Sequence, residues 1–271
     1  MSWIQALILG LVQGLTEFLP ISSSAHLKIA KKCLGIAGDE SLLLFDLVCH
    51  AGTWAALVIY LRRDIWKVLC SLKQISLFSL ALAPLIPAYF LLKPIRIALS
   101  DPSYLGYFLL FTGSLLYLAS RKKVPELALA TASSPISPQP APPKKWLDVL
   151  CIGGMQAFAL IPGISRSGST LAAARFCGWQ WRDAARFSFL LAVPTIFGGL
   201  VLEMFKPSGS GTDPISVVSL VSWGCYGVGF LAAFGLGLAS VRLIFWVYEK
   251  GNVQPFAWYC LGMGILAMAF F

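Results

Sequence analysis

Residues 3–26 read WIQALILGLVQGLTEFLPISSSAH, and this stretch joins a nearly uncharged apolar run to an abrupt break. The run Trp3–Leu19 is shorter than the ~20 apolar residues of a spanning helix, and it leads directly into Pro20 and a serine run. A short apolar helix that stops in this way and turns back is typical of a re-entrant hairpin. Such irregular backbone is tolerated at membrane depth only where protein buries it or where it lines a cavity.

The composition of the whole chain agrees with a membrane location. Of its 271 residues, 58% are hydrophobic and only 12% are charged, about half the ~25% charged fraction of an average soluble domain. The mean hydropathy is +0.77. So few charges cannot cover that much apolar surface in water, so the surface meets lipid. A disordered chain, a collagen, a secreted disulfide scaffold and a soluble protein with a nucleic-acid partner are excluded.

Six further stretches are long and apolar enough to span a bilayer. They are Leu42–Leu61, Ile75–Leu92, Tyr104–Ala119, Phe187–Phe205, Val217–Leu238 and Pro255–Phe271. A second interrupted stretch, Leu147–Ile161, leads into Pro162, glycines and another serine run. The sequence therefore predicts an all-α polytopic integral membrane protein with six spanning helices and two re-entrant helical hairpins.

The two interrupted stretches occupy corresponding places, because each precedes three of the predicted spans. Three is an odd number, so the second half would be inserted upside down, which is the pattern of an inverted repeat. The alternative is two unrelated kinked helices. We expect a single membrane domain over 1–271, made of one repeat (1–120), a Pro-rich linker (121–146) and a second repeat (147–271).

The net charge of +9 is expected to reflect mainly Lys and Arg in cytoplasmic loops, which set the topology. The linker and the loop Arg62–Gln74 are both rich in basic residues, so we place both in the cytoplasm. Both chain termini then lie on the exterior face. The basic cluster Lys28–Lys32 disagrees with this orientation.

The first motif is QGLTEFLPISSSAH, residues 13–26. Gln13 and Glu17 are four residues apart and share one helix face, while the serines can cap the next helix. His26 lies three residues after Ser23, so a hydroxyl and an imidazole can point the same way. Hydrolysis needs an anchor for metal or water, a base and a nucleophile, and this break offers all three. The alternative is a capped helix with an incidental Glu and His.

The second motif is PGISRSGST, residues 162–170. Small residues let a ligand approach the backbone, and the helix that follows offers N–H donors and a positive dipole end. The guanidinium of Arg166 adds a planar fork suited to phosphate. The alternative is a loop arginine at the lipid headgroups. We expect a phosphate-binding site formed by Ser165, Arg166, Ser167, Gly168 and Thr170.

Two weaker signals remain open. Asp46 and His50 are four residues apart near the start of a predicted span, and they are either a buried pair lining the cavity or an interfacial pair. The glycine run Gly224–Gly237 is either a small-residue interface in a homodimer or packs within one chain.

The two serine-rich motifs, together with FSFLLAVP from Phe187 to Pro194, resemble the bacterial undecaprenyl-diphosphate phosphatases of the bacitracin-resistance type. The resemblance covers nearly the whole chain. It implies an inner-membrane enzyme with inverted repeats that removes the terminal phosphate of undecaprenyl diphosphate, a polyprenyl lipid, and so regenerates the carrier for peptidoglycan synthesis. It also implies an active site open to the exterior face and a supporting divalent cation, Mg²⁺ or Ca²⁺.

The family motifs map onto this chain residue by residue. The first carries Glu or Gln and then Glu, here Gln13 and Glu17, so this chain has one carboxylate where some relatives have two. Its serine and histidine correspond to Ser23 and His26. The second motif corresponds to Ser165, Arg166, Ser167 and Thr170.

The residues fit this chemistry in several ways. Glu17 and Gln13 could hold the cation together with the substrate's own oxygens and waters, and Arg166 would stabilise charge on the transferring phosphoryl group. The preferred nucleophile is Ser23 with His26 as its base. His26 attacking directly, or activating a water that Ser23 orients, is the alternative. A polyprenyl-phosphate flippase is the competing class, because inverted repeats with broken helices are also a transporter architecture.

Overall fold

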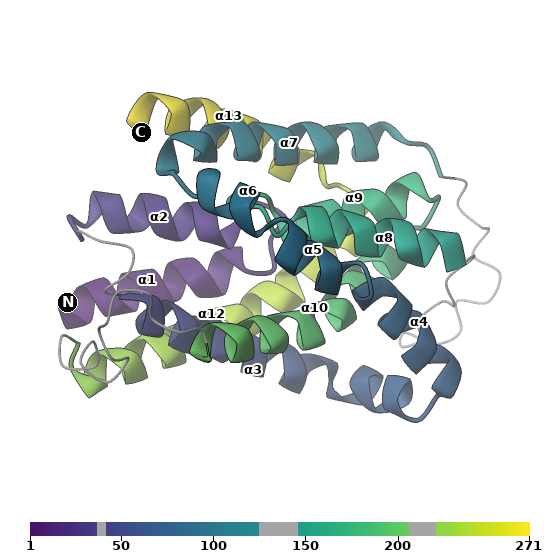
Figure 1. Ribbon diagram of the computed structural model, residues 1–271, viewed down its shortest axis with the longest axis horizontal. Coiled ribbons are helices and arrows are strands. Elements are labelled where there is room, and N and C mark those ends of the chain that lie inside the picture. The colour runs from purple at the N-terminus through teal and green to yellow at the C-terminus, as the bar shows by residue number, and fades with distance from the viewer. Residues whose placement is uncertain (37–41, 125–145, 206–220) are drawn as a thin grey trace. The chain divides into compact units, whose positions relative to one another are not determined.

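The computed structural model describes residues 1–36, 42–124, 146–205 and 221–271, and the secondary structure it describes there is helical throughout (Figure 1). Its contacts divide the chain into two compact units. Unit 1 contains Met1–Leu19, Ser23–Tyr60 and Ala192–Ile244, and unit 2 contains Pro20–Ser22, Leu61–Leu191 and Phe245–Phe271. Each unit therefore takes segments from both halves of the sequence. The inverted repeat stays a prediction.

Unit 1 begins with the predicted first hairpin. Helix α1 (Trp3–Thr16) starts with a capping box in which Ser2 and Gln5 each bond the other's backbone N–H. Helix α2 (Ser23–Cys33) runs back alongside α1 (Figure 1). At 14 and 11 residues, both helices are too short to cross a bilayer, which needs ~20 residues.

The remaining helices of unit 1 are long. They are the first part of α3 (Leu43–Leu69), the second part of α10 (Trp181–Met204) and most of α12 (Trp223–Glu249). The indole N–H of Trp54 on α3 donates to the Val193 carbonyl oxygen on α10 at 3.0 Å. The apolar core of the unit lies between α1, α2, α3 and α12 and includes Leu9, Phe45 and Ala233.

Glycines bring the backbones of unit 1 close together. A Cβ on Gly10 of α1 would lie 2.6 Å from the carbonyl oxygen of Gly229 on α12. A Cβ on Gly52 of α3 would lie 2.6 Å from the carbonyl oxygen of Phe230, also on α12. Gly224 and Gly229 likewise pack against Trp3 and Phe45. These glycines of the run Gly224–Gly237 pack within one chain, and the homodimer stays a prediction.

Unit 2 contains the second hairpin, α8 (Trp146–Phe158) and α9 (Arg166–Phe176), which lie side by side. Helix α7 (Leu105–Arg121) runs along α13 (Gln254–Phe270) over most of its length (Figure 1). The unit also includes short helices in the order α4 (Leu72–Leu82), α5 (Leu85–Leu91), α6 (Lys93–Ala98) and the 3₁₀ turn η2 (Pro102–Tyr104).

The prediction of an all-α polytopic membrane protein is confirmed, with changes in detail. In the described part of the chain, five helical segments are long and apolar enough to span: Leu43–Leu69, Leu72–Leu91, Pro102–Arg121, Trp181–Met204 and Trp223–Glu249. The sixth predicted span, Pro255–Phe271, corresponds to the apolar helix α13, which has 17 residues. The predicted start of the fifth span at Val217 and most of the predicted linker (125–145) lie outside the described residues.

One predicted boundary is wrong. The expected loop Arg62–Gln74 is mostly helical, because α3 continues to Leu69 through residues that include neither proline nor glycine. The connection to α4 is only Cys70 and Ser71, and the Ser71 hydroxyl accepts from the Gln74 N–H. The predicted span Ile75–Leu92 corresponds to the helical segment Leu72–Leu91. The helix is interrupted after Leu82, where Pro84 lacks the N–H that a continuous helix would use.

Candidate active site

The break between α1 and α2 places polar groups at the end of one short helix and the start of the next. The last turn of α1 is closed by the Thr16 hydroxyl, which donates to the Val12 carbonyl oxygen at 2.7 Å. Ser22 has a φ of 69°, a left-handed conformation that costs a residue other than glycine about 1–2 kcal/mol. Strain of this kind is concentrated at functional sites and tight turns.

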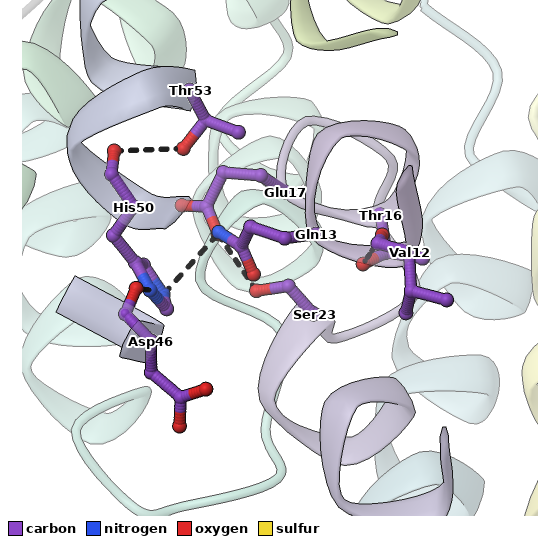
Figure 2. Close-up of polar contacts among 8 residues, drawn as sticks. All are labelled: Val12, Gln13, Thr16, Glu17, Ser23, Asp46, His50 and Thr53. Carbon is purple, nitrogen blue, oxygen red and sulfur yellow. Dashed lines mark hydrogen bonds and ion pairs between the residues drawn. The ribbon is translucent and has the colours of Figure 1, made fainter. Parts of the chain in front are cut away.

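Glu17 is the centre of the polar cluster in unit 1 (Figure 2). Its Oε2 accepts hydrogen bonds from Gln13 Nε2 at 2.9 Å and from the Ser23 hydroxyl at 2.7 Å. Gln13 is fully buried and Glu17 is 8% exposed. The structure therefore confirms that Gln13 and Glu17 share a face, and it brings Ser23 to the same carboxylate.

His50 on α3 also belongs to this cluster. Its Nε2 lies 3.8 Å from Glu17 Oε2, and its Nδ1 lies 2.8 Å from the main-chain carbonyl oxygen of Asp46. The Asp46 carboxylate points away from Glu17 (Figure 2) and pairs with the buried Lys31 at 2.6 Å. The spacing of Asp46 and His50 predicted that they act as a pair. The structure instead places His50 beside Glu17 and the Asp46 carboxylate beside Lys31.

The pairing of Lys31 also bears on the topology prediction. Lys31 is 5% exposed, so it lies inside unit 1 and not in a solvated loop. A buried lysine needs a partner to offset the loss of hydration, and Asp46 provides it. The cluster Lys28–Lys32, which disagreed with the predicted orientation, therefore contains at least one lysine with a structural role.

His26 is buried on the first turns of α2, three residues after Ser23. The Ser23 hydroxyl donates toward Glu17, which makes this carboxylate an acceptor within hydrogen-bond distance of the predicted nucleophile. The catalytic roles of Ser23 and His26 stay predictions.

The second motif lies in unit 2, at the start of α9. Ser165 is the N-cap: its hydroxyl accepts from the Gly168 N–H at 3.1 Å, and its own N–H donates to Thr112 Oγ1 of α7 at 3.3 Å. Ser167 Oγ lies 3.2 Å from Ser165 Oγ. Arg166 is the first residue of the helix. The helix start predicted from the sequence is therefore present, and the structure shows that Ser165 caps it.

Thr170 connects this helix to α10. Its hydroxyl lies 2.5 Å from Ser188 Oγ and 3.0 Å from the Arg166 carbonyl oxygen, to which it donates. Ser188 belongs to the FSFLLAVP segment. Nothing in the second motif itself identifies Ser188 or Thr112 as its partners, and only the family resemblance of the FSFLLAVP segment pointed toward Ser188.

The donors in unit 1 fit a divalent cation in part. Among the described residues, no group of three His, Cys, Asp or Glu side chains could hold a metal ion. The Gln13 Oε1 atom, however, is buried without a hydrogen-bond partner beside the Glu17 carboxylate. Amide and carboxylate oxygens are ligands that Mg²⁺ and Ca²⁺ prefer. Two such residues leave coordination positions for the oxygens of a substrate.

The fold and these motifs define a class: polytopic helical membrane proteins in which two helix–break–helix hairpins carry the polar residues. Within this class, residues 6–266 match the model of the family described as bacitracin resistance protein BacA, and the chain belongs to this family.

Three similar proteins support the same assignment. The chain is 37% identical to an undecaprenyl-diphosphatase of Protochlamydia amoebophila over 98% of both chains. It is 32% identical to one of Salinibacter ruber over 99% of both, and 33% identical to one of Methanobrevibacter smithii over 98% of this chain and 96% of the relative.

Proposed function

We propose that this protein is an undecaprenyl-diphosphate phosphatase. It hydrolyses undecaprenyl diphosphate to undecaprenyl phosphate and inorganic phosphate, which recycles the lipid carrier for peptidoglycan synthesis and confers resistance to bacitracin. The observation that carries the proposal is the Ser23 hydroxyl bonded to the buried Glu17 carboxylate at the break of a short apolar hairpin. The family membership and the names of the relatives support it.

The protein spans the membrane several times, and we place it in the bacterial inner membrane with its active site open to the exterior face. A polyprenyl substrate has a long apolar tail, so an enzyme that acts on its diphosphate must work at the bilayer. The predicted cytoplasmic position of the basic linker supports the assignment of faces.

The start of α9 is the proposed phosphate-binding site. Backbone N–H groups at a helix N-terminus and the helix dipole favour an anion there, and Arg166 adds a charge that pairs with two phosphate oxygens at once. Ser165, Ser167, Gly168 and Thr170 shape this helix start. The arrangement stabilises the charge that builds on the phosphoryl group during transfer.

The hydroxyl of Ser23 is the preferred nucleophile. In this version its oxygen bonds to the terminal phosphorus, the bond from that phosphorus to the bridging oxygen breaks, and undecaprenyl phosphate leaves. A base (His26, or Glu17, which already accepts the hydrogen bond) takes the serine proton, and water then releases phosphate from the serine. In the alternative, His26 is the nucleophile or activates a water that Ser23 orients.

A divalent cation, Mg²⁺ or Ca²⁺, is proposed to support the reaction. Glu17 and Gln13 would hold it, with the substrate's oxygens and water completing its coordination. Its contribution would be to neutralise negative charge on the diphosphate.

Phosphate release from a polyprenyl diphosphate by the purified protein tests the function. Wild type should release phosphate in the presence of the cation, EDTA should abolish release, and Arg166→Ala should lower kcat/KM by about 10²–10³-fold, as loss of a transition-state charge partner does. If wild type released no phosphate with any metal, the proposed phosphatase activity would be wrong. The flippase alternative would then be tested by lipid transport in vesicles.

Ser23→Ala separates the two chemical versions, with Ser24→Ala as the matched control in the same serine run. We expect Ser23→Ala to lose at least about 10³-fold in kcat, because a covalent route has no substitute for its nucleophile, while Ser24→Ala stays near wild type. Full turnover by Ser23→Ala would exclude the serine nucleophile. A trapped phosphohistidine at His26 would support the alternative.

A further inference from the structure

The orientation of the His50 ring is set by its own helix. Nδ1 lies 2.8 Å from the main-chain carbonyl oxygen of Asp46, one turn earlier on α3. A carbonyl oxygen only accepts hydrogen bonds, so Nδ1 carries the proton, and in the neutral imidazole Nε2 is then the nitrogen with the free electron pair.

This Nε2 faces a carboxylate oxygen at a distance that a direct hydrogen bond does not explain. It lies 3.8 Å from Glu17 Oε2 (Figure 2), whereas N–H···O bonds span roughly 2.7–3.2 Å. The same Oε2 already accepts from Gln13 and Ser23. Two electron-pair donors therefore face each other across a gap, which is the arrangement that a cation between them would stabilise.

Gln13 is a second, independent indication of a cation. Its side chain is fully buried, and its Oε1 has no hydrogen-bond partner although Nε2 of the same amide bonds to Glu17. An unpaired buried amide oxygen costs free energy unless something binds it. Gln13, Glu17 and His50 therefore bring an amide oxygen, a carboxylate and an imidazole nitrogen into one small polar cluster.

We propose that His50 Nε2 is a further metal ligand beside Gln13 and Glu17, and that it makes this site bind Mn²⁺ more tightly than Mg²⁺ or Ca²⁺. The proposal rests on the proposed function, in which a cation supports hydrolysis. It adds a ligand to a site in which Gln13 occupies the position of the second carboxylate of some relatives. Metal-binding histidines almost always donate their other ring N–H to a carbonyl or carboxylate. The Nδ1–H of His50 does so to the Asp46 carbonyl oxygen. Imidazole suits transition metals, whereas Mg²⁺ prefers oxygen ligands.

Pulsed EPR of Mn²⁺ bound to the full-length protein tests this directly. The chelator-treated protein in nanodiscs is loaded with Mn²⁺, alone and with methylenediphosphonate as a stable stand-in for the diphosphate. We expect a ¹⁴N coupling from a directly bound imidazole in wild type. Because the chain has only two histidines, His26→Gln should keep the coupling and His50→Gln should remove it. Thr53→Val, one turn further along α3, is the matched control and should also keep it.

Binding constants provide a second readout that needs no turnover. His50→Gln should raise the Kd for Mn²⁺ by at least about tenfold, in line with losses on removing a ligand or its support, and change the Kd for Mg²⁺ by less than about threefold. An absence of histidine coupling in wild type in both arms would overturn the proposal, as would unchanged Mn²⁺ binding by folded His50→Gln. Both results would be expected if His50 were a protonated imidazolium paired with Glu17 and not a metal ligand. Phosphate release by wild type is measured separately, so a failure here leaves the proposed hydrolysis intact.

Discussion

At the scale of single residues, one carboxylate organises the polar cluster in unit 1. Glu17 accepts from an amide and a hydroxyl on its own hairpin and faces an imidazole from α3. Charged groups are costly in an apolar setting and are retained mainly where they function. The three contacts keep the carboxylate in one orientation beside Ser23, whichever version of the chemistry holds.

Removing the charge of Glu17 while keeping its shape tests this role. Glu17→Gln should lower kcat/KM by about 10²–10³-fold, because an amide neither takes a proton from a hydroxyl nor binds a cation strongly. Phosphate release is the measurement, and an unchanged melting temperature shows that the fold survives. The matched control is Glu249→Gln, which changes a half-exposed carboxylate near Arg182 and should leave activity unchanged. Activity of Glu17→Gln within about threefold of wild type would contradict the role.

At the scale of helices, the breaks follow from proline and serine, and the close packing follows from glycine. In unit 1, α1 and α3 approach α12 at glycines whose missing side chains leave room for the neighbouring backbone or ring. Without a hydrophobic driving force between helices in lipid, such close contacts are a main source of helix association. The positions of Gln13 and His50 relative to one another depend on this packing.

Two glycines on α12 offer a matched comparison. A Cβ on Gly229 would lie 2.6 Å from the ring of the buried Phe45, whereas a Cβ on Gly227 would meet nothing within 4 Å. Gly229→Ala should destabilise the fold by about 1–3 kcal/mol, as overpacking does, and Gly227→Ala should be neutral or slightly stabilising. Thermal unfolding in detergent measures both. Equal melting temperatures for the two variants would contradict the close packing of α3 and α12.

At the scale of the whole molecule, the chain is a multi-pass membrane protein whose basic residues set its predicted orientation. The basic cluster Lys28–Lys32 is weaker evidence against this orientation than its charge suggests, because the buried Lys31 pairs with Asp46. The remaining bias still predicts that the Pro-rich linker lies in the cytoplasm and both termini outside.

Fusions to alkaline phosphatase test this orientation, because the enzyme is active only outside the cytoplasm. We expect a fusion after Phe271 to be active and one within residues 125–145 of the linker to be inactive. Matched protein levels by immunoblot are the control. The reverse pattern of activity would show that the predicted orientation is wrong.

The sequence by itself determined the membrane class, the two broken hairpins and the residues at each break. These features depend on composition and on local rules: lipid exposure follows from the scarcity of charge, and the breaks follow from Pro20, Pro162 and the Ser165 cap. The continuation of α3 beyond Leu61 was missed, because a charged helix end is a weak local signal, and so was the interruption of the predicted span Ile75–Leu92 near Pro84.

Tertiary structure alone decided which side chains meet across elements. His50 faces Glu17, the Asp46 carboxylate pairs with Lys31, and Thr170 meets Ser188 on the next helix. The physical reason is that a helix pattern specifies which residues share a face, whereas the rotation and approach of each helix depend on how its glycines and large side chains pack against partners distant in sequence.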